Sequence, residues 1–216
     1  MKIIQTPVGS MAVFSYLVYD ETSGDGILID PAGDEARLVR LLQDHHVTLR
    51  YIVNTHGHAD HTCGNEALME QLGSRVPVVL HELDDAFFQI SENQQFARMM
   101  GFRIAPPADI RVRDGDEIPF GALTMKFIHT PGHTPGACCI MIGSQLFTGD
   151  TLFVGAVGRT DLPGASFPEL LESLRKIIAL PADTVVWPGH DYGDQPQSTV
   201  GRETRSNPYI TDFLMD

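Results

Sequence analysis

The stretch that most constrains the fold of this chain is residues 51–64, where a strand-like run leads directly into a cluster of histidines. Tyr51 to Thr55 is mostly apolar and β-prone, and four residues with metal-ligating side chains follow it: His56, His58, Asp60 and His61. Gly57 predicts a tight backbone turn between the first two histidines. Because these side chains divide into two pairs that face adjacent points, the stretch predicts two neighbouring metal ions rather than a solvated loop.

Three further candidate ligands each follow a glycine at the end of a predicted strand. They are His133 after Gly132, Asp150 after Gly149, and His190 after Gly189. A single Gly-His or Gly-Asp pair after a strand is usually a turn, but here seven ligand-type residues all fall at strand exits. The sequence therefore predicts that distant segments meet at one metal-binding cleft.

The predicted secondary structure alternates between strands and helices, then becomes mainly strands after Pro106-Pro107. Strands are predicted at 2–6, 12–19, 26–31, 51–55, 76–80, 109–113, 117–120, 122–129, 137–142, 145–148 and 184–187. Helices are predicted from Asp34, as the cap, to about His45, and at 64–72, 82–101, 167–178 and 198–205. Two sets of strands with helices outside predict an α/β fold, a four-layer α/β/β/α sandwich, and 216 residues fit one domain at 1–216.

The predicted helical segment at 82–101 has an apolar face with two interpretations. The face consists of Phe87, Phe88, Phe96, Met99 and Met100. Such a face packs into a core more often than it lines a substrate pocket, so packing is the favoured interpretation. We likewise expect His45 and His46 to cap a surface helix and Cys63 to be a core thiol.

The overall composition excludes several classes of function. The net charge is −13 and the 15 Lys and Arg residues are scattered, which argues against nucleic-acid binding. Neither a signal-peptide pattern nor an apolar run of about 18 residues occurs, so no membrane segment is predicted. The number of cysteines is odd, at three, and two of them, Cys138 and Cys139, are neighbours that would not normally pair, so no disulfide framework is predicted. Unpaired thiols favour a reducing compartment, the cytoplasm.

On these motifs the sequence resembles the metallo-β-lactamase superfamily, from Ile27-Leu28-Ile29-Asp30-Pro31 to Asn207-Pro208. Within that superfamily it is similar to glyoxalase II-like hydrolases and to persulfide dioxygenases. The resemblance implies a first metal site of His56, His58 and His133, a second of Asp60, His61 and His190, and a bridging Asp150. It also implies that Asp30 orients a ligand histidine from the outer shell.

The glyoxalase II-like resemblance implies a hydrolase of small thioesters such as hydroxyacyl-glutathione. Two divalent ions, Zn²⁺ first and Fe or Mn as alternatives, would hold a hydroxide that attacks the thioester carbonyl. Asp60 would also manage the proton of that water. By the same resemblance, Arg159 and Tyr192 would contact the glutathione moiety.

The sequence also departs from glyoxalase II. The chain ends 26 residues after His190, without the helical domain that supplies basic residues in that family, and Asp161 replaces a tyrosine. Arg202 and Arg205 are possible substitutes. The runs Gly158-Arg159-Thr160-Asp161 and Ser198-Thr199-Val200-Gly201 resemble persulfide dioxygenases as much as glyoxalase II, and the alternative is such an enzyme with one Fe(II) on His56, His133 and Asp150. The 77 residues that separate His56 from His133 (133 − 56) argue against that alternative, since they resemble short glyoxalase II-like proteins with an inserted helical segment. A non-enzymatic binding module is a third possibility.

Overall fold

The first sheet begins with an antiparallel hairpin, as the β-branched and aromatic runs on either side of Gly9 predict. The computed structural model describes residues 1–215, and in it β1 (Lys2–Val8) pairs with β2 (Val13–Tyr19). The antiparallel β3 (Asp25–Ile29) follows. Three parallel strands then complete the sheet in the order of the chain: β4 (Thr48–Val53), β5 (Val78–His81) and β6 (Ile110–Val112).

The second sheet contains six strands from the part of the chain after β6, in the order β14-β13-β10-β9-β8-β7. Its strands are β7 (Glu117–Phe120), β8 (Leu123–His129), β9 (Cys138–Ile142), β10 (Gln145–Gly149), β13 (Val185–Pro188) and β14 (Ser198–Thr199). A small hairpin of β11 (Leu152–Phe153) and β12 (Ala156–Val157) lies after β10. The sequence did not predict β11, β12 or β14, because two-residue strands carry no periodic pattern.

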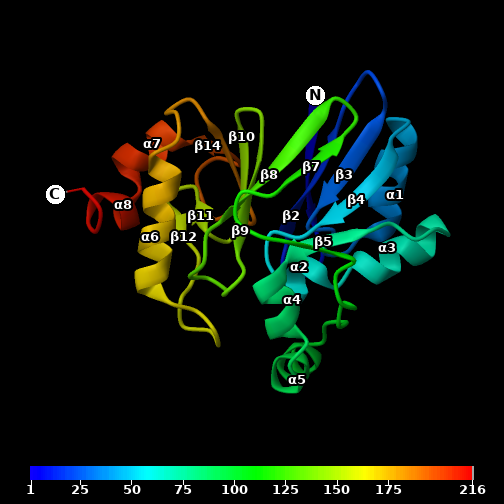
Figure 1. Cartoon of the computed structure of the whole chain (residues 1–216), viewed down its shortest axis with the longest axis horizontal. Coiled ribbons are helices and arrows are strands. Elements are labelled where there is room, and N and C mark those ends of the chain that lie inside the picture. Colours follow the sequence, from blue (N-terminus) through cyan, green and yellow to red (C-terminus); the bar gives the residue numbers. More distant parts are fainter. Residues whose placement is uncertain (216) are drawn as a thin grey trace.

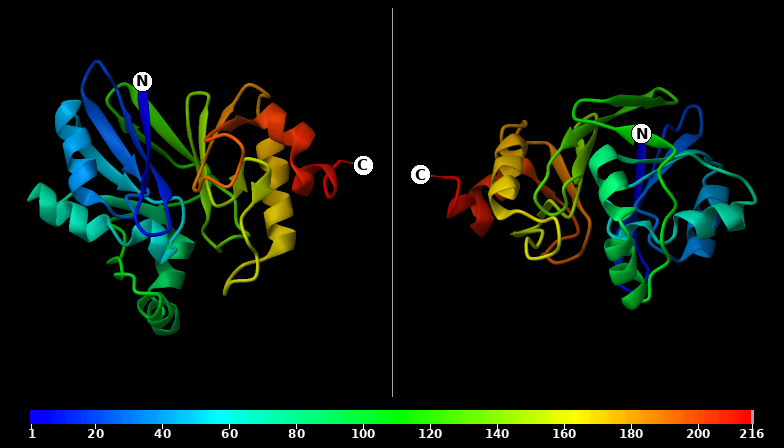
Figure 2. Two further views of the ribbon diagram at one scale, coloured as in Figure 1. Left: turned by 180° about the vertical axis from the view of Figure 1, so that it is seen from behind. Right: turned by 60° about the horizontal axis from the view of Figure 1, so that its bottom comes forward.

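Helices cover the outer face of each sheet, and Figure 2 shows the resulting layers. The helices are α1 (Glu35–Asp44), α2 (Ala59–Thr62), α3 (Asn65–Leu72), α4 (Glu82–Phe88), α5 (Ser91–Met99), α6 (Phe167–Ile178), α7 (Val200–Ser206) and α8 (Pro208–Thr211). Helices α1 and α3 lie on the first sheet, and α6, α7 and α8 lie beside the second (Figure 1). The four-layer α/β/β/α sandwich is confirmed.

Alternating side chains divide the interior into three apolar layers. Along β2, Tyr16 and Val18 face the second sheet, while Leu17 faces α1 and α3. The layer between the sheets joins these residues to Phe127 and Phe147, which are fully buried. The outer layers are held by leucines at helical spacing, such as Leu38 and Leu42 on α1 and Leu170 and Leu174 on α6.

Three predictions about individual elements were wrong. The strand at 109–113 was placed at the start of the second set, but β6 pairs in parallel with β5 in the first sheet. Asp34 occupies the cap position of α1 without capping it, since its Oδ2 atom accepts from the Gly9 N–H. The segment 82–101 forms two helices, and packing was the favoured interpretation of its apolar face, but Phe96, Met99 and Met100 are 50, 78 and 59 % exposed, while Phe87 and Phe88 are partly buried.

The cysteines agree only in part with expectation, since Cys63 was expected to be a core thiol. Within residues 1–215 all three cysteines are free thiols; Cys138 and Cys139 are buried and Cys63 is partly buried. No helix of this part of the chain is both long and apolar enough to cross a bilayer. The assignment of 1–216 to one domain stays a prediction, and Asp216 lies outside the described residues.

Candidate metal centre

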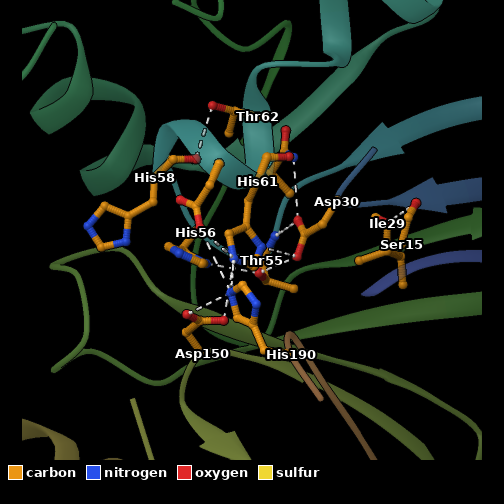
Figure 3. Close-up of polar contacts among 12 residues, drawn as sticks. Ser15, Ile29, Asp30, Thr55, His56, His58, His61, Thr62, Asp150 and His190 are labelled. Atoms are coloured by element: carbon orange, nitrogen blue, oxygen red, sulfur yellow. Dashed lines mark hydrogen bonds and ion pairs between the residues drawn. The ribbon is translucent and has the colours of Figure 1, made fainter. Parts of the chain in front are cut away.

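The seven candidate ligands meet between the two sheets, where the strands that precede them end. His56, His58, Asp60 and His61 follow β4 from the first sheet, whereas His133, Asp150 and His190 follow β8, β10 and β13 from the second. Figure 3 shows His56, His61, Asp150 and His190 directed toward one another, with Asp30 behind His61. The chain therefore brings together side chains from both halves of the sandwich.

Two groups of three side chains have the spacing that one metal ion needs. The ligand atoms of His56, His58 and His133 lie within 4.8 Å of one another, as do those of Asp60, His61 and His190. Nδ1 of His58 lies 2.9 Å from Nε2 of His133, and Nε2 of His61 lies 3.3 Å from Nε2 of His190. These groups coincide with the two sites that the sequence predicts.

Asp150 lies between the two groups. Its Oδ1 is 3.4 Å from Nε2 of His61, and its Oδ2 is 3.6 Å from Nε2 of His133 and 3.5 Å from Nε2 of His190. It also forms a third close group with His56 and His61. A carboxylate with two oxygens in this position can reach both groups at once, as a bridging ligand does.

Outer residues hold the imidazole rings in fixed orientations. Asp30 accepts from the Thr55 N–H at 2.9 Å and the Thr55 hydroxyl at 2.7 Å, and its Oδ2 lies 3.0 Å from Nδ1 of His61. Because the hydroxyl donates to Asp30, Nδ1 of His56, 3.1 Å away, donates to the hydroxyl. The network directs Nε2 of His56 and of His61 toward the centre. Asp30 thus lies next to a candidate ligand histidine, where the family resemblance places it.

The third ring is held by the backbone, since Nδ1 of His133 donates to the Arg159 carbonyl at 2.9 Å. Its Nε2 is then free to point at the cluster. A ligand histidine whose second nitrogen donates to an oxygen has a fixed tautomer and a more basic ligating nitrogen.

The donor set fits a divalent cation. Nε2 of His56 and Oδ1 of Asp150 are buried and accept no hydrogen bond from any described residue. Burial and the neighbouring imidazoles lower the pKa of His56 and His58, so both offer neutral lone pairs. Burial also disfavours the charged form of His61, but Asp150, Asp60 and Asp30 outweigh it and raise its pKa to about 10. The centre therefore attracts positive charge, which a cation can provide in place of a proton.

The sequence analysis missed Asp84, which connects the two ligand loops. Asp84 is fully buried in α4 and accepts hydrogen bonds from the Gly57 N–H at 2.7 Å and the Thr134 hydroxyl at 2.7 Å. The Gly136 N–H donates to its other oxygen at 2.5 Å. In the sequence Asp84 resembles any acidic residue in the first turn of a helix, and only its contacts distinguish it.

The backbone bends at Thr55 and His56, directly before Gly57. The φ angle of Gly57 lies outside the left-handed region, so the bend alone does not require a glycine there. A Cβ atom at this position would lie 2.2 Å from Cδ2 of Phe88, whose ring packs 5.2 Å from the His58 ring. Gly57 is needed because Phe88 closely approaches the backbone between the first two histidines.

The mouth of the centre is lined by both residues expected to bind substrate. The Arg159 guanidinium forms two bonds to Asp161, at 2.7 and 2.8 Å, and both side chains are more than half exposed. The Tyr192 ring stacks on His190, with centroids 5.0 Å apart and planes at 7°. Neither Arg202, which binds Asp194, nor Arg205 lines the mouth.

Comparison with known proteins identifies the family to which this arrangement belongs. The sequence profile described as "Metallo-beta-lactamase superfamily" matches residues 8–190. The human mitochondrial persulfide dioxygenase ETHE1 is 35 % identical over 202 residues, which are 92 % of this chain and 71 % of that protein.

Two solved structures are similar over nearly the whole chain. The BLEG-1 B3 metallo-beta-lactamase has a TM-score of 0.86 and 32 % identity, covering 97 % of this chain and all of that one. A di-iron-bound form of TTHA1623 has a TM-score of 0.81 and 36 % identity, covering 95 % and 99 %. Relatives that bear different names are thus about equally similar to this chain in sequence.

Proposed function

The chain belongs to the metallo-beta-lactamase superfamily, and from that premise we propose that it is an Fe(II)-dependent dioxygenase of low-molecular-weight persulfides. The observation that carries the proposal is the pairwise approach of His56, His133 and Asp150, in a chain 35 % identical to a human persulfide dioxygenase: His56 shares one close group with His133 and another with Asp150, and Asp150 lies 3.6 Å from His133. Two imidazoles and one carboxylate, with open positions beside them, are typical of non-haem Fe(II) oxygenases. The sequence analysis ranked the thioester hydrolase first, and the proposal reverses that ranking.

The chain's own residues would hold the ion and orient its ligands. Nε2 of His56, Nε2 of His133 and the Asp150 carboxylate are the ligands, and the Thr55 hydroxyl and the Arg159 carbonyl fix the two rings. A bound Fe(II) supplies the activation of dioxygen. For a persulfide R–S–SH the balance is one O₂ and one H₂O consumed, with one thiol, one sulfite and two protons released.

The second candidate is a dinuclear thioester hydrolase, the function that the sequence analysis placed first. The observation that favours it is the complete second group, Asp60, His61 and His190, which an enzyme with one ion does not need. A relative that has been described in a di-iron form supports the same candidate. With two ions, Zn²⁺ or Fe, the Asp60 carboxylate would accept the proton of the attacking water.

Two assays and one elemental analysis distinguish the candidates. For the dioxygenase we expect oxygen uptake with glutathione persulfide, about one iron per chain, and no anaerobic hydrolysis of lactoylglutathione. Anaerobic hydrolysis with about two metal ions per chain would instead support the hydrolase. If the chain bound no divalent metal, both the dioxygenase and the hydrolase would be excluded, and the non-enzymatic binding module would be the remaining possibility.

The cytoplasmic location stays a prediction. It rests on the three free thiols, since a reducing compartment keeps such thiols from pairing.

A further inference from the structure

The wall of the metal-site mouth is apolar, although the centre itself is polar. The residues around the mouth include Met11, Phe88, Phe96, Met100 and Phe102. Phe96 and Met100 project from α5 and the turn after it and are half exposed or more. Exposed apolar side chains gathered around a pocket mark a place where an apolar ligand group is bound.

The mouth offers little free positive charge from side chains to an anionic ligand. Apart from the histidines and the candidate metal ligands Asp60 and Asp150, the charged side chain of this lining is Arg159. Asp161 already occupies two nitrogens of the Arg159 guanidinium, in the bidentate geometry that a substrate carboxylate would otherwise use. A net charge of −13 on the chain adds a long-range repulsion of anions.

The apolar wall is continuous with the metal centre. Phe88 packs against the edge of His58 and stands at Gly57, so one end of the wall touches a ligand loop. Phe96 and Met100 line the same mouth as His133 and Asp150, whereas Met99, on the same helix, does not. A group attached to a sulfur atom at the centre would therefore lie on this wall.

We propose that the substrate carries an apolar group on its sulfur, bound against Phe88, Phe96 and Met100, and that Asp161 weakens the binding of glutathione derivatives by occupying Arg159. The inference rests on the proposed sulfur chemistry of the site and specifies its substrate class as alkyl or aryl persulfides. Asp161 thus acts as a specificity-determining residue.

Binding of unreactive thioethers to the metal-loaded protein tests the substrate class separately from turnover. We compare benzyl methyl sulfide, which is apolar and neutral, with S-methylglutathione, which is anionic, by isothermal titration calorimetry. We expect the benzyl compound to bind more tightly by roughly tenfold or more, since burying its ring on the wall is favourable and Arg159 is occupied. Equal or tighter binding of S-methylglutathione would overturn the proposal.

Matched variants test the wall. Phe96→Ala and Met100→Ala should each weaken benzyl methyl sulfide binding by roughly three- to tenfold, because each removes apolar contact area. Met99→Ala is the control, since Met99 is still more exposed on the same helix but lies outside the lining. The wall would be rejected if Phe96→Ala, Met100→Ala and Met99→Ala bound the compound equally well.

The role of Asp161 has its own control. Asp161→Asn should strengthen S-methylglutathione binding by roughly three- to tenfold and leave the benzyl compound unchanged, because it releases the guanidinium. Asp194→Asn removes a second exposed bidentate pair, with Arg202, and should change neither. If Asp161→Asn and Asp194→Asn behaved alike, Asp161 would have no part in specificity.

Turnover separates a failure of this inference from a failure of the proposed function. Oxygen uptake with glutathione persulfide but less with benzyl persulfide would support the dioxygenase and contradict the apolar substrate class. If neither persulfide consumed oxygen, the proposed function would fail, and the thioether binding ratio would still decide which ligand class the mouth accepts.

Discussion

The carboxylate of Asp84 accepts a hydrogen bond from the backbone N–H of Gly57 at 2.7 Å, so α4 holds the loop that carries His56 and His58. The same carboxylate binds Thr134 and Gly136, on the loop that carries His133. One buried acid therefore sets the spacing between two ligand loops that come from different sheets.

We expect Asp84→Asn to lower metal affinity by roughly 10- to 100-fold, as loss of an outer-shell partner typically does. An amide can accept only on one side, so either the Gly136 N–H, or the Gly57 N–H together with the Thr134 hydroxyl, loses its acceptor. Metal titration of the apo-protein measures the affinity. Asp85→Asn is the control, because Asp85 is also buried in α4 but binds the Ala108 N–H and Arg111 instead. Equal losses in the two variants would mean that Asp84 only stabilises the fold.

Gly57→Ala should destabilise the ligand loop, because the new methyl group would lie 2.2 Å from Phe88. Overpacking of this kind typically costs roughly 1–3 kcal/mol of unfolding free energy. Chemical denaturation measures that cost. Gly57→Ala should cost less unfolding free energy in a Phe88→Ala background than in the wild type, because the clashing ring is gone. Equal costs in the two backgrounds would rule out the clash as the cause.

Asp60→Ala separates the two candidate functions. Under the dioxygenase proposal the ligands His56, His133 and Asp150 remain, so the variant should keep its iron and most of its oxygen uptake. A dinuclear hydrolase would instead lose the ion held by Asp60, His61 and His190, together with its turnover. Metal content per chain, measured with each assay, reports which of these occurs.

The stability of the chain should fall in acid partly through Asp20. Hydrogen bonds from Ala122, Thr22 and Ser23 lower the pKa of Asp20 from its ordinary value of 3.8 to about 2. Because the folded pKa is the lower one, the stabilisation is complete above about pH 4 and is lost as the pH falls toward 2.

Asp20→Asn should flatten this part of the stability profile. Denaturation midpoints measured from pH 2 to 6 should differ most between wild type and variant at the upper end of the range. A constant difference at all pH values would show that the charge of Asp20 is not involved.

Short-range patterns account for what the sequence predicts correctly. Leu38 and Leu42 mark α1 by their spacing, and each group of candidate ligands lies in the loop that follows a strand, so both signals are local in the sequence. The remaining features depend on distant partners. Asp84 is separated by 27 to 52 residues from its hydrogen-bond donors, and the pairing of β6 with β5 is decided across two helices. The apolar face of Phe96 and Met100 gives no local sign of whether protein or ligand covers it.

The most direct measurement is the metal content per chain of the purified wild-type protein and of Asp150→Ala, prepared side by side. We predict about one iron in the wild type and a loss of most of it in the variant, since Asp150 touches both groups of histidines. A wild-type protein that takes up no divalent metal, or an Asp150→Ala variant that keeps the full content, would contradict a metal centre built from these distant side chains.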